Sequence, residues 1–290
     1  MPASDEGDSR VVPHSGCADN ASVSLVHAAV DAHAADWVVE GVRDDFDCTV
    51  GGLVPAVFGR YARVFHPASR DERLGDESIE VRWADVASAN NLMMHPAAEW
   101  GSLTGSWQID GQPDLWDHPP RLGQLPQRLA EHLAEALAPF AERTDRCFFG
   151  VWEGWGTPSA LILFKQGTPE AEQRQAYESA NAEIRTQRGF LDGAPTFTLP
   201  HRGMHLLEGP LSAISAFYEN HRNPPSLWWP EDRAWCVATD IDLMSTYVGG
   251  SADAIQALLS NEQIEALAVP IEQSLTWEAD TINPLPKPPS

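Results

Sequence analysis

Lysine is almost absent from this sequence: it occurs only at Lys165 and Lys287, and the other seventeen basic residues are arginine. The 19 basic residues face 42 acidic ones, so the formal charge is -23. This balance argues against a protein that binds a phosphate backbone or an anionic membrane surface. We therefore expect no nucleic-acid partner and no membrane partner, which leaves a basic protein or a small-molecule ligand. Arginine in place of lysine, with many alanines, is typical of a GC-rich bacterial genome.

Closely spaced cysteines and long apolar runs are also missing. The four cysteines are far apart and form no CxxC pair, which argues against a disulfide framework or a zinc site. No apolar run approaches the length of a membrane span, and the acidic N-terminus does not have the pattern of a signal peptide. We expect a soluble, cytoplasmic protein with reduced thiols. The four cysteines are Cys17, Cys48, Cys147 and Cys236.

Complete catalytic and phosphate-binding motifs are absent as well. Gly249, Gly250 and Ser251 could cradle a phosphate at a helix start, but neither GxGxxG nor GxxxxGK[ST] is present and Asp253 would repel the phosphate. The same residues are explained more simply as the entry to a helix that Ser251 caps. No GxSxG nucleophile elbow occurs there either. The sequence therefore predicts no cofactor.

The composition predicts a globular α+β protein. Its 290 residues and hydrophobic fraction of 43% are enough for a sizeable core. We expect a disordered acidic tail over residues 1–21, a single α+β domain over 22–283 and a Pro-rich disordered end over 284–290. The expected architecture is a mixed or mainly antiparallel sheet with several packed helices.

Apolar periodicity predicts the individual elements. Tryptophans in the irregular stretch 90–122 are expected to pin a long loop to the core rather than to stack on a ligand. The predicted strands are 61–65, 79–83, 147–155, 160–164, 196–199, 204–208 and one from Trp235 onward. The predicted helices run from Ser22 or Ser24 through Trp37, and over 126–142, 169–188, 211–219, from Ser251 and over 262–268.

The stretch Leu227–Gly250 is the best site candidate because it combines tryptophans, strand alternation and two carboxylates. Alternation from Trp235 places Asp240 and Asp242 on the face away from the core. Two such carboxylates can bind a cation or divide acid and base roles. The favoured interpretation is that they cap the turn after the strand, as Asp commonly does.

A catalytic hypothesis combines these aspartates with Glu153. That carboxylate lies between Trp152 and Trp155, and sugar-cleaving enzymes use two carboxylates across an aromatic-lined cleft. The candidate catalytic residues are Glu153, Asp240 and Asp242. The candidate ligand-binding residues are Trp155, Trp228, Trp229 and Trp235.

His201, His205 and Glu208 are residues of the types that bind metal ions. Two histidines four residues apart share a face only on a helix, whereas Pro200 and Gly203 favour an extended or turn geometry. The ligand spacing therefore has the wrong local structure, and the sequence predicts no metal.

Three stretches carry a resemblance to a known group of proteins. They are Asp240–Ser251, Tyr61–Pro67 and Asp280–Asn283. On these residues the chain resembles a family of uncharacterised bacterial hypothetical proteins with no assigned activity. The resemblance covers most of residues 22–283 and implies one continuous domain, with no implication for the chemistry.

Two alternative hypotheses for the function remain. The favoured one is a non-catalytic binding or interaction protein whose acidic surface meets a cationic partner, of the immunity kind that neutralises a toxin. The alternative is a hydrolase that acts on a carbohydrate through its paired carboxylates. The absence of a complete catalytic motif favours the first.

Overall fold

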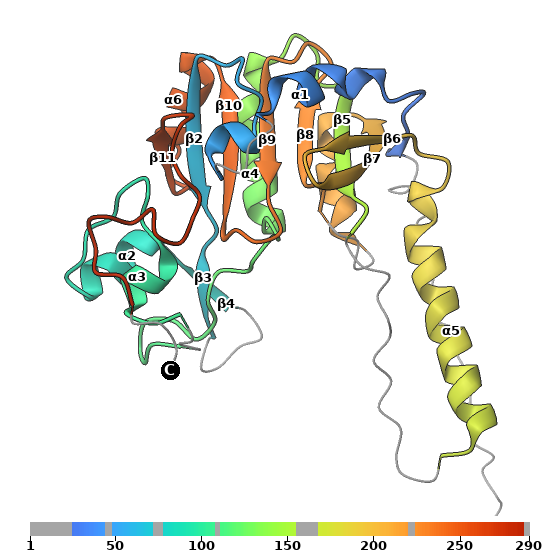
Figure 1. Ribbon diagram of the computed structural model, residues 1–290, viewed down its shortest axis with the longest axis horizontal. Helices are drawn as coiled ribbons and strands as arrows, with labels where there is room; N and C mark the ends of the chain where they lie inside the picture. Colours follow the sequence, from blue (N-terminus) through green and yellow to red (C-terminus); the bar gives the residue numbers. More distant parts are fainter. Residues whose placement is uncertain are drawn as a thin grey trace, which may run out of the picture.

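A nine-stranded antiparallel sheet forms the centre of the computed structural model, which describes residues 25–43, 48–71, 78–107, 111–154, 168–219 and 224–286 (Figure 1). The strand order is β1-β7-β5-β8-β9-β10-β2-β11, and β6 pairs with β7. The predicted α+β class and antiparallel sheet are confirmed. The strands are β1 (His27–Ala28), β2 (Arg60–Phe65), β5 (Cys147–Trp152), β6 (Thr196–Leu199), β7 (Arg202–Gly209), β8 (Leu227–Pro230), β9 (Trp235–Thr239), β10 (Ser245–Gly250) and β11 (Ala266–Val269).

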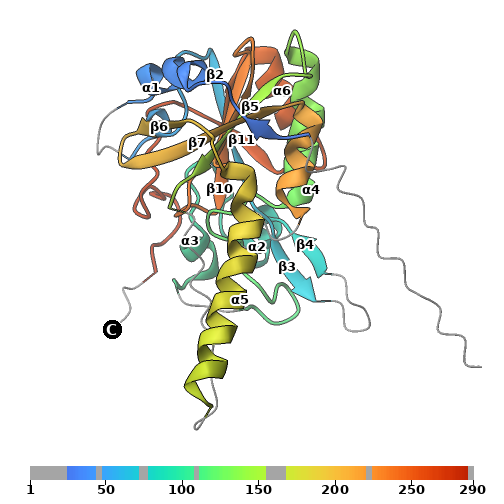
Figure 2. The ribbon, with the colours of Figure 1, turned by 90° about the vertical axis from the view of Figure 1, so that its right-hand side faces the viewer.

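Helices cover both faces of this sheet (Figure 2). One face packs against α4 and α6, whose leucines join the core cluster that contains Trp228, Trp235 and Val237. The other face packs against α1 and contributes Trp229, with Cys236, to a second cluster. The helices are η2 (His33–Ala35), α1 (Asp36–Gly41), η3 (Val50–Gly52), α4 (Gln127–Leu137), η4 (Ala138–Phe140), α5 (Glu170–Arg188), η5 (Gly189–Leu191), η6 (Leu211–Phe217) and α6 (Ala252–Leu259).

A smaller unit extends from one end of the sheet (Figure 1). It contains the two-stranded sheet of β3 (Ala68–Asp71) and β4 (Ser78–Val81), with α2 (Trp83–Ala89) and α3 (Trp100–Thr104). Its core is a row of indole rings with edge-on contacts: Trp83 lies 5.2 Å from Trp100, and Trp100 lies 5.1 Å from Trp116. Trp100 and Trp116 are buried, which confirms that they pin this segment to a core. The segment is not a loop throughout, because Trp100 begins α3.

Several predicted elements are confirmed with close boundaries. Strong periodicity or strand composition identified β2, β6, α4 and α5. The strand predicted at residues 79–83 is also present, as β4, and α2 follows it. Ser251 caps α6 as expected, because its Oγ accepts a hydrogen bond from the backbone N of Ala254 at 3.1 Å.

Other predictions were wrong where tertiary contacts override local propensity. The helix expected from Ser22 or Ser24 through Trp37 is replaced by β1, η2 and α1, because β1 pairs with β7. The helix expected over 262–268 is replaced by a turn and the strand β11, which adds to the sheet beside β2. The charged composition of residues 69–78 favours a loop, but residues 69–71 belong to β3, which pairs with β4. The expected tail 1–21 and the expected strand 160–164 lie outside the described residues, as do 287–290.

The alternation of β9 predicted the surroundings of only one of its two faces correctly. Trp235 and Val237 face one core cluster as predicted, but Cys236 and Ala238 face the second cluster instead of solvent. A strand that lies between β8 and β10 in a sheet covered on both faces must be apolar on both sides. The strand ends at Thr239, so Asp240 and Asp242 lie in the following turn.

Candidate functional site

Asp240 organises the turn between β9 and β10. One of its carboxylate oxygens accepts a hydrogen bond from the backbone N of Asp242 at 2.9 Å, and its carbonyl accepts one from Leu243 at 3.2 Å. Asp240 is half-buried, whereas Asp242 is exposed. This pattern is an Asx-turn, which confirms the turn-capping interpretation for Asp240.

The other oxygen of Asp240 forms an ion pair with Arg202 at the start of β7. The next residue, Gly203, lies directly under Glu153: a Cβ at position 203 would be 2.1 Å from Glu153 Oε2. The backbone N of Glu153 also donates to the Gly203 carbonyl at 2.9 Å. The structure thus brings Glu153 and Asp240 to the same short segment, with the Arg202 guanidinium bound to Asp240.

The tryptophans proposed as ligand contacts lie inside the protein. Trp228 and Trp235 meet edge to face at 5.4 Å on one side of the sheet, and Trp229 stacks on Phe148 at 5.8 Å on the other. These three of the four candidate tryptophans have 0% exposure, so their role in this structure is packing. Trp155 lies outside the described residues. Trp228, Trp229 and Trp235 therefore do not form the aromatic cleft expected beside the carboxylates.

Buried thiols do not add a nucleophile. Cys147 and Cys236 are both buried in the sheet. Burial raises the pKa of the Cys147 thiol to about 12 and raises the pKa of the Cys236 thiol as well, because the thiolate would lose its hydration. Neither side chain is therefore a reactive thiolate near neutral pH.

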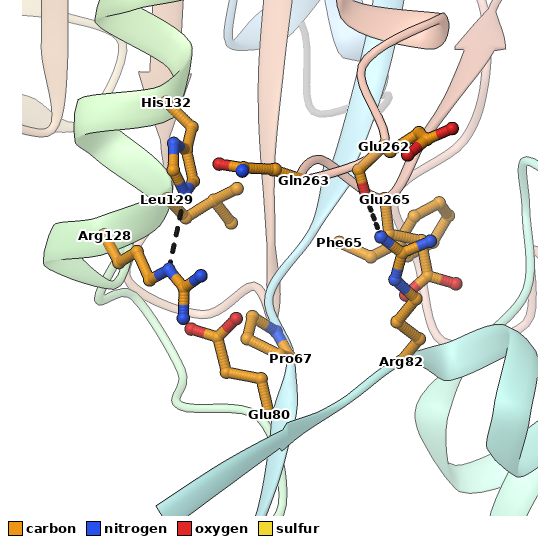
Figure 3. A pocket seen from close by; sticks show the side chains of 10 residues that line it. All are labelled: Phe65, Pro67, Glu80, Arg82, Arg128, Leu129, His132, Glu262, Gln263 and Glu265. Atoms are coloured by element: carbon orange, nitrogen blue, oxygen red, sulfur yellow. Dashed lines mark hydrogen bonds between the residues drawn. The ribbon is translucent and has the colours of Figure 1, made fainter.

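A cavity of about 230 Å³ opens beside the junction of the two units (Figure 3). Phe65 of β2 and Leu129 of α4 form its apolar floor. The polar walls come from three separate places: Arg128 and His132 on α4, Glu80 and Arg82 on and after β4, and Glu262, Gln263 and Glu265 before β11. Cationic and anionic groups therefore alternate around a small apolar base.

Two of the polar side chains are fixed by the fold. Arg82 donates a hydrogen bond to the carbonyl of Glu262, which closes one side of the cavity. Glu265 accepts hydrogen bonds at 2.8 Å from the backbone N atoms of Trp83 and Ala84, which are unpaired donors at the start of α2. Burial raises the pKa of Glu265, and these two bonds oppose the shift. These residues hold the walls in place before any ligand arrives.

Other polar side chains of the cavity keep unused bonding capacity. Arg128 Nε lies 3.4 Å from His132 Nε2, and its two terminal nitrogens have no partner among the described residues. Glu80 and Glu262 are exposed, and within the described ranges their carboxylates accept no hydrogen bond. A neighbouring cavity of about 300 Å³ shares Arg82, Glu262 and Glu265.

A group of carboxylates and arginines lies in the segment between α4 and β5 and at the end of β8. Arg146 is shared by Glu231, at 2.5 Å, and Glu208, at 3.1 Å. Arg143 is shared by Asp145, at 2.7 Å, and Glu231, at 3.9 Å. Hydrogen bonds to these carboxylates raise the pKa of both arginines. We define the acidic edge as the carboxylates Glu142, Asp145, Glu208, Glu231 and Asp232 with the arginines Arg143 and Arg146.

A buried polar cluster, which sequence reasoning missed, joins distant segments around Arg63. Its guanidinium donates to Ser245 Oγ at 2.9 Å and to the carbonyls of Pro96 and Ala98 at 3.1 and 2.9 Å. It also pairs with Glu99 Oε1 at 3.4 Å. An arginine inside an aromatic strand is one sequence signal for this cluster.

Asp280 forms the second half of this cluster. It bonds His95 Nε2 at 2.9 Å and accepts hydrogen bonds from the backbone N atoms of Glu99, Ile282 and Asn283. Burial alone would raise the pKa of Asp280, but these bonds outweigh it and lower the pKa. The three stretches that carry the resemblance therefore converge here, through Arg63, Ser245 and Asp280.

Two features are absent from the residues that the structure describes. Within those residues, no group of three or more His, Cys, Asp or Glu side chains could hold a metal ion. None of the helices in the same ranges has the length and apolarity of a membrane span. The chain matches no protein-family model, no curated protein and no solved structure. Its resemblance to uncharacterised bacterial proteins stays a prediction.

Proposed function

We propose that this chain is a non-catalytic binding protein that meets a cationic partner through its acidic surface. The acidic edge carries the proposal. Each of its two arginines is shared between two carboxylates, drawn from Asp145, Glu208 and Glu231. Glu142 and Asp232, joined through the backbone N of Glu142, add two further carboxylates. The edge therefore keeps excess negative charge that its own arginines do not neutralise.

The net charge of the whole chain adds a long-range attraction to the local charge of this edge. A formal charge of -23 attracts cationic molecules from outside contact distance and speeds their encounter. At physiological ionic strength the attraction is screened beyond about 8 Å, so it acts on a partner that comes close. A small basic protein, such as a toxin held inactive by an immunity protein, has the chemistry that this surface would recognise.

The proposal is tested by the salt dependence of binding. The immobilised full chain is exposed to purified lysozyme, cytochrome c and ribonuclease A, three small basic proteins, at low and at physiological ionic strength. We expect at least one of them to bind and its affinity to fall steeply as salt is added. Binding that is independent of ionic strength, or absent for all three at low salt, would overturn the proposal.

A second candidate, a carbohydrate hydrolase, is supported by one observation: Glu153 and Asp240 both contact the Arg202–Gly203 segment. Two-carboxylate mechanisms need the carboxyl groups about 5–9.5 Å apart across the sugar. The ion pair with Arg202 already occupies Asp240, which is the weaker point of this candidate. Hydrolysis of aryl glycosides by the chain that is lost in Asp240→Asn would favour the hydrolase over the binding protein.

A further inference from the structure

The arrangement of charges in the cavity of Figure 3 points to a specific ligand class. Arg128 and Glu80 are neighbours on adjacent walls, and Figure 3 shows the Glu80 carboxylate directed toward the Arg128 guanidinium. No hydrogen bond or ion pair joins these two side chains in the described structure. A cation and an anion that stand side by side without bonding each other can together bind a molecule that carries both charges.

The size of the cavity limits that molecule. Pockets for drug-sized ligands have volumes of about 300–1,000 Å³, and this cavity measures about 230 Å³. An oligosaccharide or a peptide segment is therefore too large to be enclosed. The apolar floor of Phe65 and Leu129 would receive a small aliphatic group.

We propose that this cavity binds a small aliphatic α-amino acid, with Arg128 as the partner of its carboxylate and Glu80 as the partner of its ammonium group. In an α-amino acid the two charges are attached to one carbon, which matches the adjacent positions of Arg128 and Glu80. Gln263 can donate to the carboxylate and accept from the ammonium.

One wall of the cavity is already held in place without a ligand. Arg82 and Glu265 are held by bonds to the backbone and keep the wall between the two cavities in place. This wall would therefore not need to rearrange on binding. The exposed side chains of Arg128 and Glu80 would be ordered by the ligand itself. This inference does not depend on the acidic edge, which involves other elements.

Calorimetric titration of the full chain with L-valine tests the proposal. We expect binding in the millimolar range or tighter. Isobutylamine lacks the carboxylate and 3-methylbutanoate lacks the ammonium group, so each should bind at least about tenfold more weakly. Arg128→Gln and Glu80→Gln should each weaken valine binding by about tenfold, since each removes one charge-assisted contact.

Two matched variants serve as controls. Arg60→Gln and Glu40→Gln remove the same charges at exposed positions that do not line the cavity, and both should bind valine like the original chain. The proposal is overturned if neither L-valine nor L-alanine binds at millimolar concentration. It is also overturned if isobutylamine binds as tightly as L-valine, or if the cavity variants bind valine as well as the controls do. None of these results bears on the salt-dependent binding of a basic protein.

Discussion

Arg63 and Glu99 form an ion pair inside the protein, with 3.4 Å between Nη2 and Oε1. Their side chains expose only 6% and 20% of their surface, so water screens the pair weakly. Burial nevertheless raises the pKa of Glu99 to about 7, against the attraction of Arg63. Glu99 therefore changes its charge near neutral pH, beside a guanidinium that remains charged.

We predict that Glu99 makes the free energy of unfolding depend on pH. In the unfolded chain its carboxyl ionises near the ordinary pKa of 4.5, so between 4.5 and 7 the folded state binds more protons. Its contribution is complete below about pH 4.5 and is lost as the pH rises through about 7, by up to about 3 kcal/mol. Glu99→Gln should remove this loss. Chemical denaturation at about pH 5 and pH 8 measures the difference between the two proteins.

Glu142→Gln is the matched control, because Glu142 is exposed. This variant should keep the pH dependence of the original chain. The account of Glu99 is contradicted if Glu99→Gln and Glu142→Gln show the same change in stability between the two pH values.

A second prediction concerns the hydrogen-bond chain from His66 to Thr239. Burial lowers the pKa of His66 to about 4, so its ring is neutral at pH 7. Nδ1 lies 3.2 Å from the Arg121 carbonyl, which can only accept, so Nδ1 carries the proton. Nε2 must therefore accept from Thr246 at 2.9 Å, and Thr239 donates to Thr246 at 2.7 Å.

Thr246→Val should destabilise the protein by about 1–3 kcal/mol, because it leaves a buried His66 nitrogen without a donor. Thr239→Val removes only the last donor in the chain, so its effect should be smaller. Equilibrium unfolding in denaturant ranks the two variants. An equal or reversed ranking would show that the proton order in this chain is different.

The double glycine at the end of β10 provides a third prediction. A Cβ at Gly249 would be 2.4 Å from Phe58 Cδ2 and 2.8 Å from Val54 Cγ1, whereas at Gly250 the nearest atom would be 3.3 Å away. Gly249→Ala should therefore cost about 1–3 kcal/mol of stability through overpacking. Gly250→Ala should cost clearly less. Thermal unfolding of the two variants compares them, and similar melting temperatures would contradict the packing argument.

Gly249 and Gly250 also show which structural features a local sequence pattern can predict. Their position suggested the entry to a helix, but they belong to a strand that pairs with β9 and β2. The requirement for glycine comes from Phe58 and Val54, which are distant in sequence. Local patterns identified α4 and β6, where one buried face repeats at a regular interval. They failed for β11, where pairing with β2 decides the conformation.

The candidate site was only partly predictable for the same reason. The turn role of Asp240 follows from local chemistry, and the structure confirms it. The contact of Glu153 with Gly203 and the cluster around Arg63 join residues from distant parts of the chain. No spacing rule in a single sequence connects such residues. Trp228 and Trp229 looked like ligand contacts because of their density, but density also results from burial on both faces of a central strand.

The acidic edge is tested by paired charge-neutral variants. Glu142→Gln with Glu231→Gln removes two negative charges from the edge. Glu170→Gln with Glu172→Gln removes the same charge from exposed positions in the first turn of α5, which extends away from the sheet (Figure 1). Both double variants therefore carry the same net charge and differ only in where the charge was lost.

The affinity of these two double variants for the basic protein that binds the original chain, compared at low ionic strength, is the most direct measurement of the proposed function. We expect the edge variant to bind at least about tenfold more weakly and the α5 variant to bind like the original chain, since local complementarity acts over about 8 Å. Equal affinity of the two variants would contradict recognition of a cationic partner at the acidic edge.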